Sequence, residues 1–225
     1  MFRSRDESPE RGLSVDSITV FGASGKTGRT VVRLAVDRGL KVKAFLREGS
    51  SLDFSHESLE IVRGSLDDLD KLKDAIKGTG AVVIALGPHR QNPQAVTAKA
   101  TASVIRAARE VGTTRLVCVT GGLIGDYPGN RSYFFERMRK SAVKRQPVMM
   151  KDRDDQERFV KGSQLEWTVF KPPRLTEKSA KGGCKAGTDV KVGLLSSVTR
   201  GDLASFIVDE IQNPKHLREC VFIKN

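Results

Sequence analysis

A glycine-rich turn between a predicted strand and a predicted helix constrains the fold more than any other feature. A strand-like run at 17–21 leads into Gly22-Ala23-Ser24-Gly25-Lys26-Thr27-Gly28, and a helical pattern follows from about Thr27. Glycines at this spacing permit a sharp turn and let a diphosphate approach backbone N–H groups. They also let the helix pack closely, with its positive N-terminal end facing the anion. The segment therefore predicts a dinucleotide-binding turn.

The same residues argue against a nucleotide-hydrolase phosphate loop. Gly25-Lys26-Thr27 matches the end of that motif, which also needs a glycine five residues before Gly25. That position holds Val20. A second strand, at 41–46, completes the strand–helix–strand unit that dinucleotide binding requires, whereas an ordinary tight turn would not need it.

The residue after the second strand indicates which cofactor binds. Sites specific for NAD place an acidic residue there to bind the ribose 2′-hydroxyl, whereas a 2′-phosphate needs a cation. Arg47 occupies this place, and its guanidinium can bind phosphate through two hydrogen bonds. Ser50 and Ser51 can add hydroxyl donors, although Glu48 is adjacent and Arg47 could instead be a solvated loop residue. We favour NADP(H).

Strands and helices alternate along the rest of the chain, which is typical of a parallel sheet covered on both faces. The pattern predicts a single α/β domain over 17–225, a Rossmann-type doubly wound sheet. Residues 1–16 are polar and mixed in charge, and we expect a disordered tail. Further strands are expected at 59–62, 81–86, 116–120, 167–171 and 221–224. Further helices are expected at 69–77, from Pro93 to about Val111, and after Thr199, which resembles a capping residue.

The net charge of +12 is concentrated in one segment. Arg131 to Lys151 contains seven Lys or Arg residues and one acid, Glu136. A solvated helix face explains this simply, and steering of an anionic cofactor is a second explanation. No nucleic-acid motif accompanies the segment, so a nucleic-acid partner is not expected. The segment is also a candidate surface for a protein partner.

The cysteine spacing and the hydropathy limit which disulfides, metal sites and membrane spans the protein can have. Cys118, Cys184 and Cys220 are not closely spaced, which argues against a disulfide framework and against a zinc site. The chain has no apolar run near the ~18 residues that a membrane span requires. Residues 1–16 lack the apolar core of a secretory signal. We expect a cytoplasmic protein with reduced thiols, no bound metal and no membrane partner.

Several segments resemble one protein family. The glycine-rich turn, Phe45-Leu46-Arg47, the run at 81–87 and Val117-Cys118-Val119-Thr120 are similar to the atypical short-chain dehydrogenase/reductase group. Within it, the chain most resembles NmrA-like NAD(P)H-binding proteins and the biliverdin/flavin reductase B type. Lys151 to Arg158 and Leu165 to Pro173 are also similar to segments of that group.

The resemblance implies a role for each matching residue. The diphosphate would be wrapped by Gly22, Ala23, Ser24, Gly25, Lys26, Thr27 and Gly28. Arg47 would bind the 2′-phosphate, and Ser65 and Leu66 would lie near the adenine. Leu86 and Gly87 would pass under the cofactor, while Thr120, Gly121, Pro172 and Pro173 would lie near the nicotinamide.

The chain departs from the family at the catalytic residues. The Tyr-x-x-x-Lys pair of the main short-chain dehydrogenases has one near match, Tyr133-x-x-x-Arg137, and Gly121 stands where reductase B relatives carry a serine. Tyr133, His89 or water are the candidate proton donors. Hydride transfer from NADPH to a flavin or quinone-like acceptor needs little more than ring stacking and exclusion of water.

Two functions from different classes follow. We expect an NADPH-dependent oxidoreductase that reduces a planar conjugated small molecule. The alternative is an NmrA-like sensor that binds NADP(H), performs no chemistry and signals through a protein partner. An epimerase or dehydratase acting on sugars would need the missing Tyr/Lys pair. Asp152 and Glu157 are expected to cap or anchor a helix.

Overall fold

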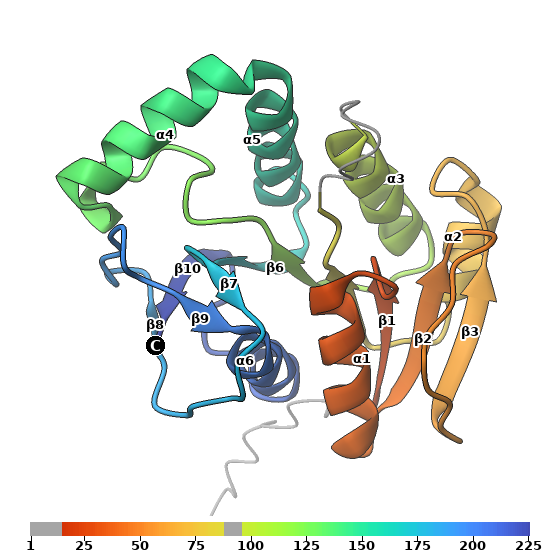
Figure 1. Ribbon diagram of the computed structural model, residues 1–225. Coiled ribbons are helices and arrows are strands. Elements are labelled where there is room, and N and C mark those ends of the chain that lie inside the picture. Colours follow the sequence, from red (N-terminus) through yellow and green to blue (C-terminus); the bar gives the residue numbers. More distant parts are fainter. Residues whose placement is uncertain (1–14, 88–95) are drawn as a thin grey trace, which may run out of the picture.

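An eight-stranded sheet forms the centre of the protein (Figure 1). The structure, a computed structural model, describes residues 15–87 and 96–225. The strand order is β3-β2-β1-β4-β5-β6-β10-β8, and every neighbouring pair is parallel except β10 and β8. The strands are β1 (Ser17–Phe21), β2 (Lys41–Leu46), β3 (Leu59–Arg63), β4 (Ala81–Ile84), β5 (Arg115–Val119), β6 (Glu166–Lys171), β8 (Lys185–Gly187) and β10 (Glu219–Lys224).

Helices cover both faces of this sheet, as the predicted doubly wound fold requires. α1 (Lys26–Asp37) and α6 (Arg200–Gln212) pack on one face through aliphatic residues such as Val32 and Ile207. α2 (Leu69–Ile76), α3 (Thr97–Glu110) and α5 (Pro147–Lys161) pack on the other, through residues such as Leu72, Val104 and Val160. The sheet is therefore buried from both sides, which explains the continuous apolar runs of β4 and β5.

α4 (Tyr133–Arg145) is arranged differently from the other helices. It extends outward beyond the sheet and meets the rest of the molecule mainly near its ends (Figure 1). Of its residues, only Phe135 is buried. The basic segment predicted from the sequence thus forms a largely exposed helix followed by the start of α5.

The strand order reverses at β1, and this locates the edge of the sheet where a ligand is expected. β1 pairs with β2 on one side and with β4 on the other. In sheets of this type, ligands bind outside the carboxyl ends of the strands, at the point where the strand order reverses. The glycine-rich turn after β1, Arg47 after β2 and Leu86 after β4 all lie at this edge.

Most expected elements are confirmed, and the differences are local. Gly39 ends α1 with a φ of +82°, and the Thr199 side chain caps α6, both as expected. Pro93, expected to begin a helix, lies outside the described residues, which show that helix from Thr97. The sequence did not predict β8 or the separate two-stranded sheet of β7 (Leu175–Thr176) and β9 (Val198–Thr199), because these strands have only two or three residues.

Only part of the predicted N-terminal tail is described. Residues 1–14 lie outside the described residues, whereas Val15 packs against the core and the Asp16 carbonyl accepts a hydrogen bond from the Lys41 N–H at 2.9 Å. No helix within the described residues is long and apolar enough to cross a bilayer.

Candidate cofactor site

Two positions of the glycine-rich turn have no room for a side chain. Gly22 has a φ of +82°, and a Cβ there would lie 2.7 Å from the Ala85 carbonyl oxygen. At Gly28 a Cβ would lie 2.1 Å from the Gly22 carbonyl oxygen, so α1 packs directly on the turn. The Gly25 N–H closes the turn with a hydrogen bond to the Gly22 oxygen at 3.0 Å. This is the geometry expected of a diphosphate-binding turn.

The start of α1 offers donors to an anion. Gly25 is the N-cap residue, and among the described residues no side chain caps this helix end. A helix N-terminus without a side-chain cap leaves backbone N–H groups and a positive partial charge facing outward. Lys26, in the first turn, pairs with Glu177, which directly follows β7. Both of these side chains are largely exposed.

Arg47 is exposed at the carboxyl end of β2, and a fixed turn follows it. The Ser50 N–H donates to the Arg47 carbonyl oxygen at 3.1 Å, and Arg63 donates to the Ser50 carbonyl oxygen at 2.8 Å. The carboxylate of Asp53, further along the loop, is engaged with α1, because it lies 3.2 Å from Arg29. Arg47 is thus the first residue after β2, the position at which Rossmann folds contact the adenosine ribose.

The predicted adenine residues form a tight turn after β3. The Ser65 side chain accepts a hydrogen bond from the Asp67 N–H at 3.2 Å, and its carbonyl oxygen accepts one from the Asp68 N–H at 3.1 Å. Leu66 is half-buried and packs against the core face formed with α2. Ser65 is exposed at the same edge of the sheet as Arg47.

The predicted nicotinamide residues come from two loops that are joined by hydrogen bonds. The Thr120 N–H donates to the Phe170 carbonyl oxygen at 3.0 Å, and the Gly122 N–H donates to the Pro172 carbonyl oxygen at 2.7 Å. A Cβ at Gly122 would lie 3.2 Å from the Cα of Pro173. The ends of β5 and β6 therefore form one surface, which includes Gly121.

A buried arginine holds this edge together, and the sequence analysis did not identify it. Arg153 on α5 is buried, and its guanidinium donates to the carbonyl oxygens of Leu86 at 2.7 Å and Thr120 at 2.7 Å. A third hydrogen bond, of 3.2 Å, reaches the Val119 carbonyl oxygen. Arg153 thus fixes the carboxyl ends of β4 and β5, which carry four of the predicted cofactor residues.

A buried polar network lies behind Thr120. Glu157 on α5 pairs with Lys171 at the end of β6, and both side chains are almost fully buried. The same carboxylate accepts hydrogen bonds from the Tyr127 hydroxyl at 2.6 Å and from the Thr120 hydroxyl at 3.2 Å. Tyr127 also lies 3.0 Å from the sulfur of Cys220.

The network fixes the charges of its members. Burial opposes ionisation of Glu157, but Lys171, Tyr127 and Thr120 outweigh it and hold the pKa of this carboxyl below its ordinary value. Burial, followed by the neighbouring Glu157 charge, raises the pKa of Tyr127. Tyr127 is therefore a neutral hydroxyl that donates to a carboxylate. Because Thr120 donates to the same carboxylate, neither hydroxyl proton is free in this arrangement.

One sequence signal could have revealed these residues. Arg153, Gln156 and Glu157 share a helix face with Val160, so three polar residues stand where an apolar stripe is expected. Asp152 behaves as expected, because it anchors α3 by accepting the N–H groups of Thr97 and Ala98 at 3.1 and 2.9 Å. The buried position of Lys171 has no comparable signal, since a lysine at the end of a strand is usually exposed.

The structure describes one of the two candidate proton donors, Tyr133. Tyr133 is the first residue of α4 and is 68% exposed, and its hydroxyl accepts a hydrogen bond from Arg137 at 3.3 Å. Phe135, two residues later, is the side chain of this helix that lies against Gly122. His89 lies outside the described residues. Both roles remain predictions.

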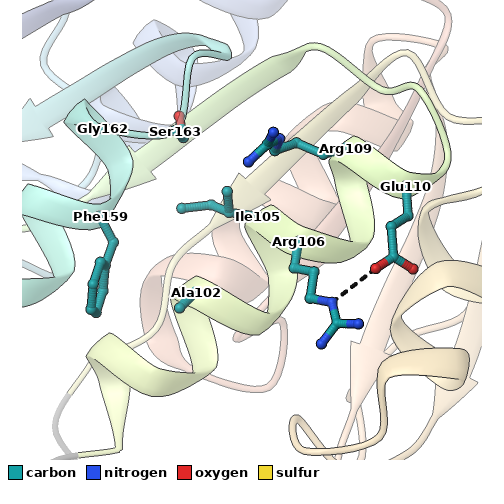
Figure 2. A pocket seen from close by; sticks show the side chains of 8 residues that line it. All are labelled: Ala102, Ile105, Arg106, Arg109, Glu110, Phe159, Gly162 and Ser163. Atoms are coloured by element: carbon teal, nitrogen blue, oxygen red, sulfur yellow. Dashed lines mark hydrogen bonds and ion pairs between the residues drawn. The ribbon is translucent and has the colours of Figure 1, made fainter.

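Two of the cavities in the described part of the chain are lined by residues other than the predicted cofactor residues. The larger, of about 530 Å³, lies between α3 and α5 (Figure 2). Its lining residues are Ala102, Ile105, Arg106, Arg109, Glu110, Phe159, Gly162 and Ser163. A smaller cavity, of about 290 Å³, is lined by Arg174, Thr176, Lys178, Lys181, Ser197 and Asn225. Neither includes a predicted cofactor residue, and within the described residues no cluster of His, Cys, Asp or Glu could hold a metal ion.

Comparison with known proteins agrees with this geometry. Residues 22–214 match the profile of the NAD(P)H-binding family. The uncharacterized protein YwnB of Bacillus subtilis is 25% identical over 217 residues, which cover 90% of this chain and 95% of YwnB.

Solved structures share the fold, among them the following two. A wide-type short-chain dehydrogenase/reductase from Veillonella parvula in complex with NADP has a TM-score of 0.76 at 15% identity, covering 94% of this chain and 95% of its own. The anaerobillin reductase ChuY of Escherichia coli O157:H7 has a TM-score of 0.73 at 20% identity, covering 92% and 96%.

Proposed function

Since the chain belongs to the NAD(P)H-binding family, we propose that it is an NADPH-dependent oxidoreductase that transfers hydride to a planar conjugated acceptor, a flavin or a quinone-like molecule. The observation that carries the choice of cofactor is the position of Arg47. Arg47 is the first residue after β2. The carboxylate of Asp53, further along the same loop, forms an ion pair with Arg29. A cation at this place favours a 2′-phosphate over a 2′-hydroxyl.

The proposed acceptor follows from what the nicotinamide end of the site contains. The residues expected there, Gly121 and the pair Pro172-Pro173, have no acidic or basic side chain. The hydroxyl of Thr120 is engaged with Glu157. Reduction of a flavin or quinone suits such a site, because hydride transfer between stacked rings depends on orientation and exclusion of water. The bound NADPH supplies the hydride, and the protein orients its rings.

Two solved structures with this fold support the proposal. The Veillonella parvula protein was crystallised with NADP, and ChuY is an anaerobillin reductase. A cytoplasmic location also fits, because Cys118, Cys184 and Cys220 are all free thiols.

The decisive experiment measures cofactor binding and turnover on the same protein. Isothermal titration calorimetry should show NADP(H) binding more tightly than NAD(H), and Arg47→Glu should remove that preference. Arg109→Glu, which changes an exposed arginine on α3, is the matched control and should leave it intact. Oxidation of NADPH is then followed with FMN, riboflavin and menadione. If neither nicotinamide cofactor binds, the proposal is wrong.

A non-catalytic NADP(H) sensor is the second candidate, and one observation favours it. The near match to the catalytic pair, Tyr133 and Arg137, lies on the exposed face of α4. α4 also belongs to the basic segment 131–151, which would be the surface for a protein partner. Tight NADP(H) binding without NADPH oxidation by any acceptor supports the sensor, whereas turnover that is lost in Arg47→Glu supports the enzyme.

A further inference from the structure

An exposed turn near the start of α4 has leucines at both of its corners. The turn spans residues 193–196 and is closed by the Ser196 N–H, which donates to the Gly193 carbonyl oxygen at 3.0 Å. The Ser196 hydroxyl accepts the Gly193 N–H at 2.9 Å, so the turn is fixed twice. Leu194 is 51% exposed and Leu195 is 93% exposed. Turn corners usually hold polar residues or glycine, so two protruding leucines indicate contact with an apolar environment.

α4 presents a basic face to the solvent beside this turn. Tyr133, Arg137, Lys140 and Lys144 recur at helical spacing, and all four are exposed. Among the described residues, none of these three cations forms an ion pair with an acid. Arg137 lies 5.8 Å from the centre of the Tyr133 ring and donates to its hydroxyl. Phe134, the next residue along, is 64% exposed.

Backbone contacts join the turn to the helix. The Ser132 N–H donates to the Val192 carbonyl oxygen at 2.9 Å, and a Cβ at Gly193 would lie 3.3 Å from the Ser132 hydroxyl. Ser132 is the N-cap of α4. In Figure 1 the segment that leads to β9 reaches the start of α4. Leu194 and Leu195 therefore lie at the same end of the helix as Tyr133 and Phe134. We call these four residues, with Arg137, Lys140 and Lys144, the docking surface.

We propose that the docking surface binds an anionic lipid bilayer. Exposed Phe, Tyr and Leu side chains next to a row of Lys and Arg are the features with which interfacial helices bind membranes. The apolar side chains protrude, and a soft bilayer can accept them, whereas a folded partner would need matching pockets. Aliphatic leucines would have no role on nucleic acid, which is bound through phosphates and base stacking.

Such binding needs no membrane-spanning segment. The sequence showed no apolar run of spanning length and predicted no membrane partner, because it could not reveal which apolar residues are exposed. Peripheral binding adds a few inserted side chains to an electrostatic attraction that depends on ionic strength. The proposal does not depend on the reductase activity. Tyr133 of the docking surface is also a candidate proton donor, so the variants below alter Leu195, Lys140 and Lys144 and leave Tyr133 and Arg137 unchanged.

The test is flotation of the full chain with phosphatidylcholine vesicles, with and without phosphatidylserine. We expect the protein to float only with phosphatidylserine and to be released by added salt. Leu195→Ser should lower partitioning, while Leu217→Ser, which alters another exposed leucine, should not. The double change Lys140→Gln and Lys144→Gln should weaken partitioning by about 5-fold for each lysine. The matched double change Lys41→Gln and Lys178→Gln is the control.

Several results would overturn the proposal. One is an absence of phosphatidylserine-dependent flotation at low salt. Another is binding that the Leu195 and Lys140/Lys144 variants leave unchanged. If sedimentation equilibrium instead reveals self-association that Leu195→Ser abolishes, the surface binds a second copy of the chain. Circular dichroism of each variant shows that the fold is retained, since every altered side chain is exposed.

Discussion

The guanidinium of Arg153 on α5 donates a hydrogen bond of 2.7 Å to the carbonyl oxygen of Leu86, which follows β4. Because the same guanidinium also donates to the Thr120 carbonyl oxygen after β5, one side chain sets the spacing of two strand ends. A cofactor that passes across this edge would contact both Leu86 and Thr120. The two hydrogen bonds from Arg153 on α5 fix the distance between these residues.

Replacing Arg153 with methionine should loosen this edge. The buried carbonyl oxygen of Thr120 and the half-buried one of Leu86 lose the donors that lie 2.7 Å away, and each unsatisfied buried group costs about 1–3 kcal/mol. We therefore expect the free energy of unfolding to fall by roughly 3 kcal/mol, measured by urea denaturation, and affinity for NADP(H) to fall in calorimetry. Arg158→Met, at an exposed arginine of the same helix, should change neither. Unaltered stability in Arg153→Met would mean that these hydrogen bonds contribute nothing.

The Glu157–Lys171 pair should show strong coupling in a double-mutant cycle. Lys171→Met leaves a buried carboxylate without its cation, which typically costs about 3–5 kcal/mol. The double variant Lys171→Met, Glu157→Gln removes both charges and should recover a large part of that loss, because the desolvation penalty disappears as well. Unfolding in urea measures all four corners of the cycle. Additive effects would contradict a direct interaction.

Gly28→Ala should damage the turn, while Gly129→Ala should not. A methyl group at Gly28 would lie 2.1 Å from the Gly22 carbonyl oxygen, whereas no atom lies within 4 Å of the equivalent point at Gly129. Overpacking of this kind costs about 1–3 kcal/mol and moves α1 away from the turn. Thermal unfolding and NADP(H) calorimetry test both effects. Normal cofactor binding by Gly28→Ala would argue against the assigned diphosphate site.

Asp202 should make the stability of the protein sensitive to acid. Burial opposes its charge, but hydrogen bonds from Thr199, the Lys181 N–H and Asn225 outweigh this and lower its pKa to about 2. A lowered pKa contributes stability that is present above the ordinary pKa and is lost as the pH falls through the folded value. The contribution, about 2 kcal/mol, should disappear between about pH 4 and pH 2. Urea unfolding of Asp202→Asn should show a weaker pH dependence in that range, and Asp37→Asn, at an exposed site, should match the unmodified protein.

The sequence predicted the elements whose signals are local. The glycine-rich turn, Arg47 and the apolar run of β4 each depend on spacing or hydropathy within a few residues, and the structure places them together at one edge of the sheet. The capping residue Thr199 belongs to the same class, because its partner Asp202 is three residues away.

The residues that the sequence did not reveal depend on contacts between distant segments. Tyr127 is one example, because its hydroxyl donates to Glu157, which is thirty residues away along the chain. The helical spacing of Arg153 and Glu157 indicates that they share a face of α5, but only the packing of α5 against the sheet shows that this face is buried. Arg153 is a charged residue that is buried, whereas Leu194 and Leu195 are apolar residues that are exposed. Only the folded chain shows this exposure.

The hydrogen bond from the Gly122 N–H to the Pro172 oxygen has a consequence for redesign of the protein. The two loops that would enclose an acceptor cannot be varied independently, because a new backbone path in one removes the partner of the other. Changing acceptor preference therefore requires transplanting both loops as a matched pair from a single donor protein.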